Sequence, residues 1–291
     1  MAIPPHYPKI TRAGFERNRW FHPLTQEPRR RDSSASMLTM WSTVRLTRVH
    51  LVRLLPVLLV CATLAFSQES ELRTAAAVLE RYQSALGGVD TIKRVQSETI
   101  RGEVEAAGMQ GKATFVYYAK PFKSLLKVTR PDGVEITRGF DGAVSWAMTP
   151  RGVSVDKDTP LEAVRRDADL QYALHQPDYF RKLEFAGVTN FEGRTCYWLH
   201  GVTHWGKDNN QFYDVQTGLL VGYRFQADDP SAGMTIMLFQ DYKSFGGPQV
   251  ATKQIARSGD RTQTFTTTSV TYESLADSVF DLPPAVKALG K

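Results

Sequence analysis

The chain has 291 residues, of which 42% are hydrophobic, and a formal net charge of +6. The charge is uneven, since residues 1–67 carry 10 Lys and Arg against 3 Asp and Glu, whereas residues 68–291 carry 26 against 27. The positive excess therefore belongs to the N-terminal segment, and the rest of the chain lacks the basic surface expected of a nucleic-acid-binding domain.

The first element expected along the chain is an export signal. An apolar run of 13 residues at 54–66 follows three arginines, Arg45, Arg48 and Arg53. A membrane span needs about 20 apolar residues, so this shorter run is typical of the hydrophobic centre of a signal peptide, with an uncleaved anchor as the alternative. We therefore expect cleavage between Ser67 and Gln68, which leaves the mature protein periplasmic or secreted.

The length of this leader places the start of translation at an internal methionine. Counted from the first residue, the leader exceeds the usual length of about 15–30 residues. Counted from Met37 or Met40, it has 31 or 28 residues. We expect residues 1–36 to be non-native sequence or a disordered extension, 37–67 to be the signal peptide and 68–291 to form a single domain.

The cysteines indicate how the exported domain is stabilised. Cys61 lies in the apolar run, and lipid attachment there is not expected because Val60 precedes it, where a lipoprotein signal has a small residue. After cleavage Cys196 is the single remaining thiol. The domain then has no internal disulfide and depends on its hydrophobic core.

The mature chain opens with an expected amphipathic helix at 70–86. Its apolar residues recur at helical spacing, and the glycines at 87–88 end it. A short further helical turn is expected at 89–95. The recurring apolar residues of the first helix are Leu72, Ala76, Leu79, Tyr82 and Leu86.

From residue 98 the apolar residues recur at every second position, which is the period of a half-buried strand. Asp132-Gly133 and Asp141-Gly142 stand between such runs and predict hairpin turns, because glycine accepts the positive φ that these turns require. The pattern indicates an antiparallel meander. The expected strands are 99–105, 112–118, 124–130, 134–140 and 144–148.

The middle of the chain predicts helix. Thr159 suits the N-cap and Pro160 the first helical position of a helix over 160–174. Its residues Arg165, Arg166, Asp167 and Asp169 are expected on the solvent side. A second short helix is expected at 179–182.

The meander then resumes to the end of the chain, with a short helical tail at 280–289. About eleven strands without a linker indicate one mainly β domain, a curved antiparallel sheet whose concave face is covered by helices. The expected strands of this half are 183–191, 195–202, 210–215, 219–226, 234–245, 249–257 and 261–272.

Side chains that could carry chemistry are scattered. Motifs of nucleophilic, phosphate-binding and metalloprotease sites are absent from the sequence. His200 and His204 lie about 13 Å apart if extended, at about 3.3 Å per residue, which is too far to share a metal ion. His175 is expected at a helix end, and Cys196 as a buried apolar residue. The remaining carboxylate pairs are expected at the surface: Asp156/Asp158, Asp167/Asp169 and Asp228/Asp229.

We therefore expect no enzyme, no metal and no cofactor. The positive signal is apolar, because large apolar residues fall on what is expected to be one concave sheet face, where helices or a hydrophobic ligand cover them. An ordinary packed core is the alternative. The candidate ligand-binding residues are Phe115, Tyr117, Leu126, Val128, Val134, Ile136, Trp146, Val221, Tyr223, Phe225, Ile236 and Leu238, with Val144 on the same expected face.

A series of short segments, in this order and spacing, resembles the periplasmic outer-membrane lipoprotein-sorting (LolA-like) proteins, in a form found among exported proteins of acidobacteria. The likeness covers nearly all of 70–285. The segments are 78–82, 86–88, Ile92, 100–102, Lys120-Pro121, 139–142, Trp146, Gly193, 197–199, 213–219, Asp241-Tyr242 and 279–283.

The resemblance implies an incomplete, strongly curved β-barrel with helices across its open side, holding acyl chains or other hydrophobic groups. It implies a non-catalytic periplasmic carrier of a lipid or acylated lipoprotein, peripheral to membranes, and we expect a monomer. A scaffold or protein-interaction module of the same fold, with a filled core and no ligand, is the alternative. A hydrolase is a third class, which no set of residues supports.

Overall fold

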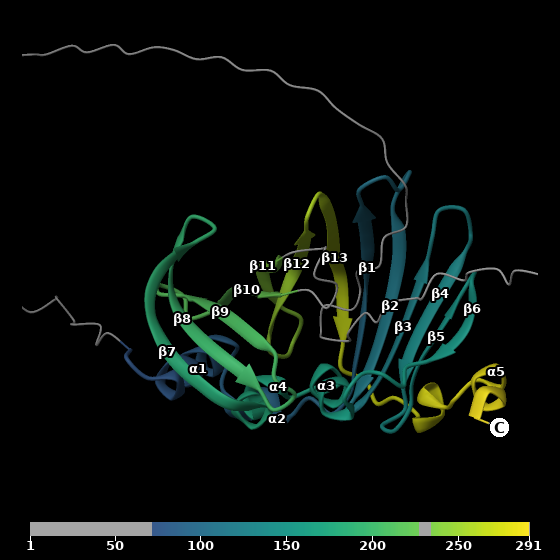
Figure 1. Cartoon of the computed structure of the whole chain (residues 1–291), viewed down its shortest axis with the longest axis horizontal. Helices are drawn as coiled ribbons and strands as arrows, with labels where there is room; N and C mark the ends of the chain where they lie inside the picture. The colour runs from purple at the N-terminus through teal and green to yellow at the C-terminus, as the bar shows by residue number, and fades with distance from the viewer. Residues whose placement is uncertain (1–71, 227–233, 291) are drawn as a thin grey trace, which may run out of the picture. The chain divides into compact units, whose positions relative to one another are not determined.

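The structure, a computed structural model, describes residues 72–226 and 234–290 (Figure 1). All of these residues belong to one of the two units into which the chain divides. The expected signal peptide with its cleavage site, Cys61, and the pair Asp228 and Asp229 lie outside the described residues. What the sequence predicts for them remains a prediction.

Two helices open the described chain. The first, α1, spans Ala75–Ala85, and the side chain of its N-cap Thr74 accepts a hydrogen bond from the backbone N–H of Ala77 at 3.2 Å. This cap explains why the helix begins later than the expected residue 70. Gly87 follows its end with φ +112, and the short helix α2, Val89–Lys93, comes next, as predicted.

Thirteen strands of the described residues form one antiparallel sheet. The sequence predicts about eleven strands, and the twelve ranges that it gives overlap all of these except the four-residue strand β6. The strands are β1 (Glu98–Ala106), β2 (Ala113–Lys120), β3 (Lys123–Thr129), β4 (Glu135–Phe140), β5 (Ser145–Thr149), β6 (Gly152–Val155), β7 (Phe180–Phe191), β8 (Arg194–Thr203), β9 (Asp208–Asp214), β10 (Leu220–Gln226), β11 (Met234–Ser244), β12 (Gln249–Ser258) and β13 (Arg261–Thr271).

The order of the strands is β6-β5-β4-β3-β2-β1-β13-β12-β11-β10-β9-β8-β7. Each half is a meander, and the two meanders meet where β1 pairs with β13, so the first and last strands lie side by side in the middle. The two edges of the sheet are therefore β6 and β7, which are joined by the predicted helical region. That region has to pass from one edge to the other.

The two Asp-Gly hairpin turns are confirmed. Gly133 and Gly142 have φ of +80 and +106. The carboxylates of Asp132 and Asp141 accept hydrogen bonds from backbone N–H groups two and three residues further on, at 3.1 and 2.7 Å. These side chains fix the turn in the way that makes aspartate common there.

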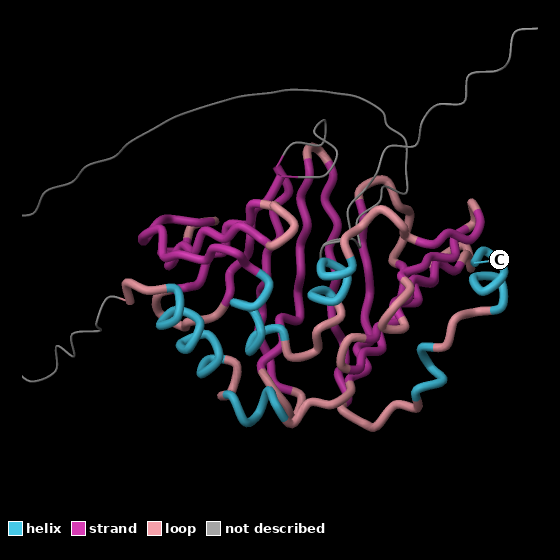
Figure 2. Tube along the Cα trace, turned by 60° about the horizontal axis from the view of Figure 1, so that its bottom comes forward, coloured by secondary structure: helices cyan, strands magenta, loops and turns pink. Residues whose placement is uncertain are grey.

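The connection between the edge strands, residues 156–179, is called the crossover segment here. It lies with α1 along one face of the sheet (Figures 1 and 2). The side chain of Gln83 in α1 donates a hydrogen bond to the carbonyl of Ala173 at 2.9 Å, which ties the two together. Its elements are α3 (Leu161–Asp167), α4 (Tyr172–His175) and the 3-10 turn η1 (Gln176–Tyr179).

The start of the crossover segment differs from the prediction. Thr159 is expected as the N-cap of the helix, but the N-cap is Pro160 and no side chain caps α3. The hydroxyl of Thr159 instead donates to the carboxylate of Asp156 at 2.8 Å. A hydroxyl already bound in this way does not serve the helix.

The prediction of one helix over 160–174 is also wrong, because the helix breaks after α3. The carbonyl of Ala168 accepts a hydrogen bond from the backbone N–H of Phe122, in the β2–β3 turn, at 3.0 Å. The side chain of Asp169 accepts one from the N–H of Gln171 at 3.0 Å. A short polar side chain that captures a nearby backbone donor competes with helix formation.

The second predicted helix, at 179–182, is not formed. The 3-10 turn η1 ends at Tyr179, and Phe180 has extended backbone angles and begins β7. The pairing of β7 with β8 determines the conformation here and overrides the local preference.

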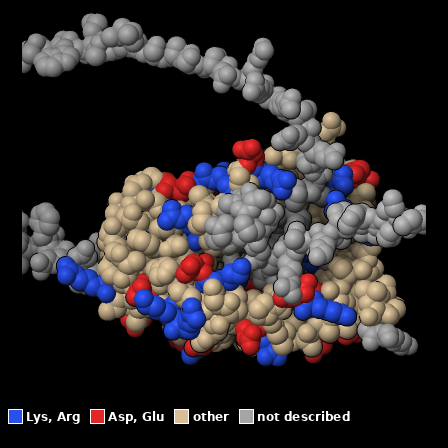
Figure 3. Space-filling view, viewed as in Figure 1, with Lys and Arg blue, Asp and Glu red and all other residues tan. Residues whose placement is uncertain are grey.

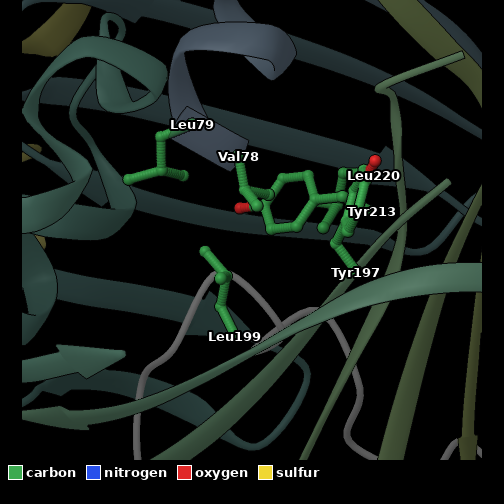
Figure 4. Packing of buried hydrophobic residues seen from close by; sticks show 6 residues of the cluster. All are labelled: Val78, Leu79, Tyr197, Leu199, Tyr213 and Leu220. Atoms are coloured by element: carbon green, nitrogen blue, oxygen red, sulfur yellow. The ribbon is translucent and has the colours of Figure 1, made fainter. Parts of the chain in front are cut away.

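One face of the sheet, called the helix-covered face here, lies under α1 and the crossover segment. Val78 and Leu79 of α1 pack there against four side chains of β8, β9 and β10 (Figure 4). Along β8 the side chains alternate, so that neighbours of these four point to the other face. The four are Tyr197, Leu199, Tyr213 and Leu220.

The opposite face is called the outer face here, and the C-terminal tail covers part of it. Phe280 and Val286 of the tail pack against Leu125 and Trp146. The short helical end that the sequence predicts is confirmed. The elements of the tail are η3 (Asp277–Phe280), α5 (Pro284–Lys287) and η4 (Ala288–Gly290).

Candidate functional site

A cavity of about 220 Å³, called the first cavity here, lies between the helix-covered face and the crossover segment. Val164 and Leu170 close it from the crossover side. Its wall on the sheet is mostly apolar, so the space under the helices is hydrophobic and is not filled by side chains. The large sheet residues that line it are Ile100, Phe115, Tyr117, Leu126, Tyr223, Met237, Phe239 and Phe265.

A second cavity of about 210 Å³ adjoins the first and extends toward α1 and α2. Pockets that hold small ligands usually have volumes of about 300–1,000 Å³. Neither cavity reaches this range alone, but the two together do. The residues that line both are Glu98, Ile100, Leu170, Tyr223, Phe239 and Gln254.

Strand register explains why these side chains converge. Ile100, Tyr117, Leu126 and Arg138 stand directly opposite one another on β1, β2, β3 and β4. Residues paired in this way share a face of the sheet, so they form one row across the wall of the first cavity. Phe239, Gln254 and Phe265 form a second row in the same way on β11, β12 and β13.

The candidate ligand-binding residues that the sequence predicts do not all lie at the first cavity. Phe115, Tyr117, Leu126 and Tyr223 line the first cavity. Val128, Ile136 and Phe225 share the helix-covered face without lining that cavity: Val128 is paired with both Phe115 and Ile136, and Phe225 packs with Met237. Val134 and Val144 lie half-buried in the turns just before β4 and β5.

For four of these residues the expectation of one shared face is wrong. Trp146 packs with Leu125 and the C-terminal tail on the outer face. Val221, Ile236 and Leu238 belong to an outer-face cluster around the stacked rings of Phe191 and Phe212, whose centres are 3.9 Å apart.

A nearly continuous apolar run causes two of these errors, at Ile236 and Leu238. Residues 234–239 read Met-Thr-Ile-Met-Leu-Phe, so alternation favours neither face. The side chains that line the first cavity are Met237 and Phe239, one position on from those predicted. At Val221 the register of β10 against β9 shifts between Leu220 and Gly222, which moves the side chain to the outer face.

Charged side chains also border the first cavity. Arg138 from β4 and Glu98 from β1 belong to the sheet, and Asp167 and Asp169 to the crossover segment. Burial lowers the pKa of Arg138 from its ordinary value. The hydrophobic space is therefore rimmed by ionisable groups that the apolar pattern does not predict.

The expectation that the middle helix exposes its charges is wrong for three residues. Arg166 and Asp167 form an ion pair at 2.9 Å with side chains 5% and 7% exposed, and Arg166 also lies over the ring of Trp205 at 4.9 Å. Asp169, with a side chain 3% exposed, is buried as well. The break at Ala168 turns the chain and places Asp169 inward. Arg166 and Asp167 precede the break, and they are buried where α3 meets Trp205 and the first cavity.

Asp169 organises the second half of the crossover segment. One carboxylate oxygen accepts a hydrogen bond from the hydroxyl of Tyr179 at 2.8 Å and contacts Nδ1 of His175 at 2.9 Å. His175 is the last residue of α4, as expected for a helix-end histidine. The carboxylate thus joins the ends of α4 and η1 to the bend that precedes them.

A second buried polar group joins η1 to the sheet. The side-chain amide of Gln176 donates to the hydroxyl of Tyr213 at 2.9 Å and also to the side chain of Gln211. The Tyr213 hydroxyl donates to Gln211 at 2.8 Å. Burial raises the pKa of Tyr213 well above its ordinary value, so this hydroxyl remains a hydrogen-bond donor.

The groups considered for catalysis or metal binding are placed separately. His200 lies in β8 with its Nδ1 3.3 Å from the side-chain oxygen of Asn210, and His204 lies beyond the end of the strand. Cys196 is buried, and burial raises the pKa of its thiol to about 11. Within residues 72–226 and 234–290, no three His, Cys, Asp or Glu side chains are grouped to hold a metal ion.

The described surface mixes charges of both signs. Figure 3 shows lysine and arginine side chains interspersed with acidic ones on the face that it presents. Among the described helices, none is long and apolar enough to cross a membrane.

The described chain is a curved antiparallel sheet with helices over one face, and it has the LolA-like fold of its structural neighbours. Solved structures bear out the assignment at low sequence identity. No family model and no curated protein matches the sequence.

Three solved structures illustrate the similarity. A LolA superfamily protein from Nitrosomonas europaea has a TM-score of 0.51 at 13% identity, covering 72% of this chain and 99% of its own. A DUF1329 family protein from Desulfovibrio piger has a TM-score of 0.51 at 15% identity, covering 72% and 98%. A putative outer-membrane lipoprotein-sorting protein domain from Vibrio parahaemolyticus has 0.50 at 13%, covering 70% and 95%.

Proposed function

We propose that this protein is a non-catalytic periplasmic carrier that binds a lipid, or the acyl chain of a lipidated protein, between its sheet and its helices. The observation that carries the proposal is the pair of adjoining cavities under the crossover segment, with the apolar wall of the first. The LolA-like fold, shared with a lipoprotein-sorting domain, supports the same function. The signal peptide that the sequence predicts at 37–67 supports a periplasmic location.

The energetics suit reversible binding. Transfer of a methylene group from water to an apolar site contributes about 0.8 kcal/mol, so eight methylenes would contribute about 6 kcal/mol before ordering costs. That is enough to hold an acyl chain and still release it. Among the described residues that line the two cavities there is no His, Cys or Lys, so these walls offer no thiol nucleophile and no imidazole or amine base, which favours binding without chemistry.

Leu125 and Leu126 provide a matched test. They are neighbours in β3 with exposed fractions of 7% and 4%, yet Leu126 lines the first cavity and Leu125 packs on the outer face against the C-terminal tail. We expect Leu126→Asn to abolish uptake of a fluorescent acylglycerol by the purified protein. Leu125→Asn should lower the melting temperature but leave uptake in the molecules that remain folded.

Two outcomes would contradict the carrier. Native mass spectrometry and lipid extraction of the purified protein could show no bound lipid, with no uptake of the probe by the wild type. Alternatively, Leu125→Asn and Leu126→Asn could reduce uptake equally, in proportion to lost folded protein. Either result would favour the scaffold alternative, in which the space under the helices holds no ligand.

A further inference from the structure

The second cavity differs in chemistry from the first. Six tyrosines and four glutamines line it, whereas the first cavity has two tyrosines and one glutamine among its lining residues. Glu98 and Gln254 stand where the two cavities adjoin. An elongated ligand spanning both would therefore meet large apolar side chains bordered by charged groups in the first cavity, and mainly tyrosine and glutamine as polar side chains in the second.

Tyr272 has a hydroxyl that the described protein does not use. It lines the second cavity, and its oxygen is buried without a hydrogen-bond partner among the described residues. By contrast, the hydroxyl of Tyr242 in the same wall donates to the carbonyl of Leu220 at 2.8 Å. A buried hydroxyl left without a partner costs free energy, so a ligand group or a water molecule that bonds to it is favoured.

The pKa of Tyr272 agrees with this role. Burial, and then the neighbouring carboxylate of Glu98, raise it to about 12. The phenol therefore stays protonated at neutral pH and can both donate and accept a hydrogen bond.

The charges around the joined cavities act against an anionic ligand. Three carboxyl groups, those of Glu98, Asp167 and Asp169, line the first cavity together with one guanidinium, that of Arg138. Arg166 pairs with Asp167 and His175 contacts Asp169, whereas Glu98 is the one charged side chain among the described residues that line the second cavity. A ligand carboxylate or phosphate placed beside Glu98 would be repelled, and an ammonium group would lose its hydration in this space. A neutral polar group meets neither cost.

We infer that the ligand is an amphiphile with a neutral, hydrogen-bonding head group, such as the hydroxyls of a glycerol ester, held in the second cavity while its chain lies in the first. This inference rests on the proposed carrier function and names its ligand class. Tyr272 binds the head group, and the neighbouring carboxylate of Glu98 disfavours free fatty acids.

Three probes of equal chain length test the inference, namely 1-monopalmitoylglycerol, palmitate and hexadecylamine. Their dissociation constants are measured by isothermal titration calorimetry with the purified protein at pH 7.5, below micelle-forming concentrations. We expect monopalmitoylglycerol to bind at least tenfold more tightly than palmitate and more tightly than hexadecylamine. One hydrogen bond changes an equilibrium constant about three- to tenfold. Tyr272→Phe should therefore weaken the binding of monopalmitoylglycerol by that factor and leave the affinity for palmitate unchanged.

Tyr118→Phe is the control, because Tyr118 packs in the outer-face cluster with Leu125 and Trp146, away from both cavities. This variant should bind all three probes as the wild type does. Palmitate or hexadecylamine binding as tightly as the glycerol ester to the wild type would overturn the inference, whether or not Tyr272→Phe folds. So would an unchanged affinity of a folded Tyr272→Phe for monopalmitoylglycerol. Binding of none of the probes would instead overturn the carrier function itself.

Discussion

The backbone N–H of Phe122 donates a hydrogen bond to the carbonyl oxygen of Ala168 at 3.0 Å, which ties the β2–β3 turn to the end of α3. Phe122 adopts φ +58, a left-handed conformation that is strained for a non-glycine residue. Its side chain is 41% exposed, so little packing depends on it. The backbone at this position, rather than the ring, holds the crossover segment against the sheet.

We therefore expect opposite results from two substitutions of Phe122. Phe122→Pro removes the donor and cannot adopt positive φ, so it should destabilise the protein by about 2–4 kcal/mol and, in the proposed carrier, speed the exchange of the bound probe. Phe122→Gly keeps the N–H and accepts the conformation, and should stay within about 1 kcal/mol of the wild type. Denaturant unfolding and probe exchange measure both, and equal stability of the two variants would contradict the proposed tie.

The buried group of Gln176, Gln211 and Tyr213 should behave as a unit. Gln176→Leu leaves the other two without a partner in η1, so we expect a loss of about 1–3 kcal/mol. Adding Gln211→Leu should cost less than it does in the wild type, because the unpaired partner is then removed. A double-mutant cycle from urea unfolding measures this coupling, and strictly additive losses would show that the hydrogen bonds contribute nothing together.

Because the pKa of the Cys196 thiol is raised in the folded protein, we expect a loss of stability at high pH. Burial first, and then the charge of Asp214, raise its pKa from 9.0 to about 11. Because the folded protein holds this proton more tightly than the unfolded chain, the stabilisation is complete below about pH 9 and is lost as the pH rises through about 11. Wild-type protein should therefore lose more unfolding free energy between pH 9 and 11 than Cys196→Ala does. Parallel curves for the two proteins would refute this.

A substitution at Gly133 measures the cost of backbone strain without a change in packing. Its φ is +80, and no atom lies within 4 Å of where a Cβ would stand. Gly133→Val should therefore destabilise by about 1–2 kcal/mol through conformation alone, and Gly133→Asn by less, because asparagine tolerates this region. Melting temperatures measure the difference, and an unchanged value for the valine variant would mean that the turn adopts another conformation in solution.

Export is predicted from residues outside the described structure. N-terminal sequencing of the exported protein should begin at Gln68 or within a few residues of it, because the apolar run at 54–66 is too short to remain as a span. Cys61→Ser should not alter processing. An acylated N-terminus at Cys61, lost in that variant, would establish a lipoprotein instead, and recovery of residues 37–66 in the mature protein would exclude cleavage.

Local patterns predict most of the fold, because hairpins are specified by short-range signals. Asp132-Gly133 and Asp141-Gly142 mark their turns, and alternation places most strands correctly. The pairing of β1 with β13 joins residues far apart in the chain, and turn signals carry no information about it.

The candidate site is predicted less completely. Alternation identifies Tyr117 and Leu126 as inward-facing, but it has no means to choose between Ile236 and Met237 in a continuous apolar run. It also misses Tyr272 and expects Asp169 at the surface, whereas other parts of the chain bury the Tyr272 hydroxyl and the Asp169 carboxylate. Polar residues in an apolar setting are recognised only when the elements that cover them are in place.

Because β1 pairs with β13 in the middle, hydrogen bonds join the sheet from one edge strand to the other, and the crossover segment links the same two edge strands covalently. A protease that cuts this segment would break the covalent link between the two halves of the sheet but would not release a fragment. The two halves would stay joined through the β1–β13 ladder and through the C-terminal tail, which belongs to the second half and packs on Leu125 and Trp146 of the first. A nicked molecule would thus migrate as one particle in solution and as two pieces under denaturing conditions.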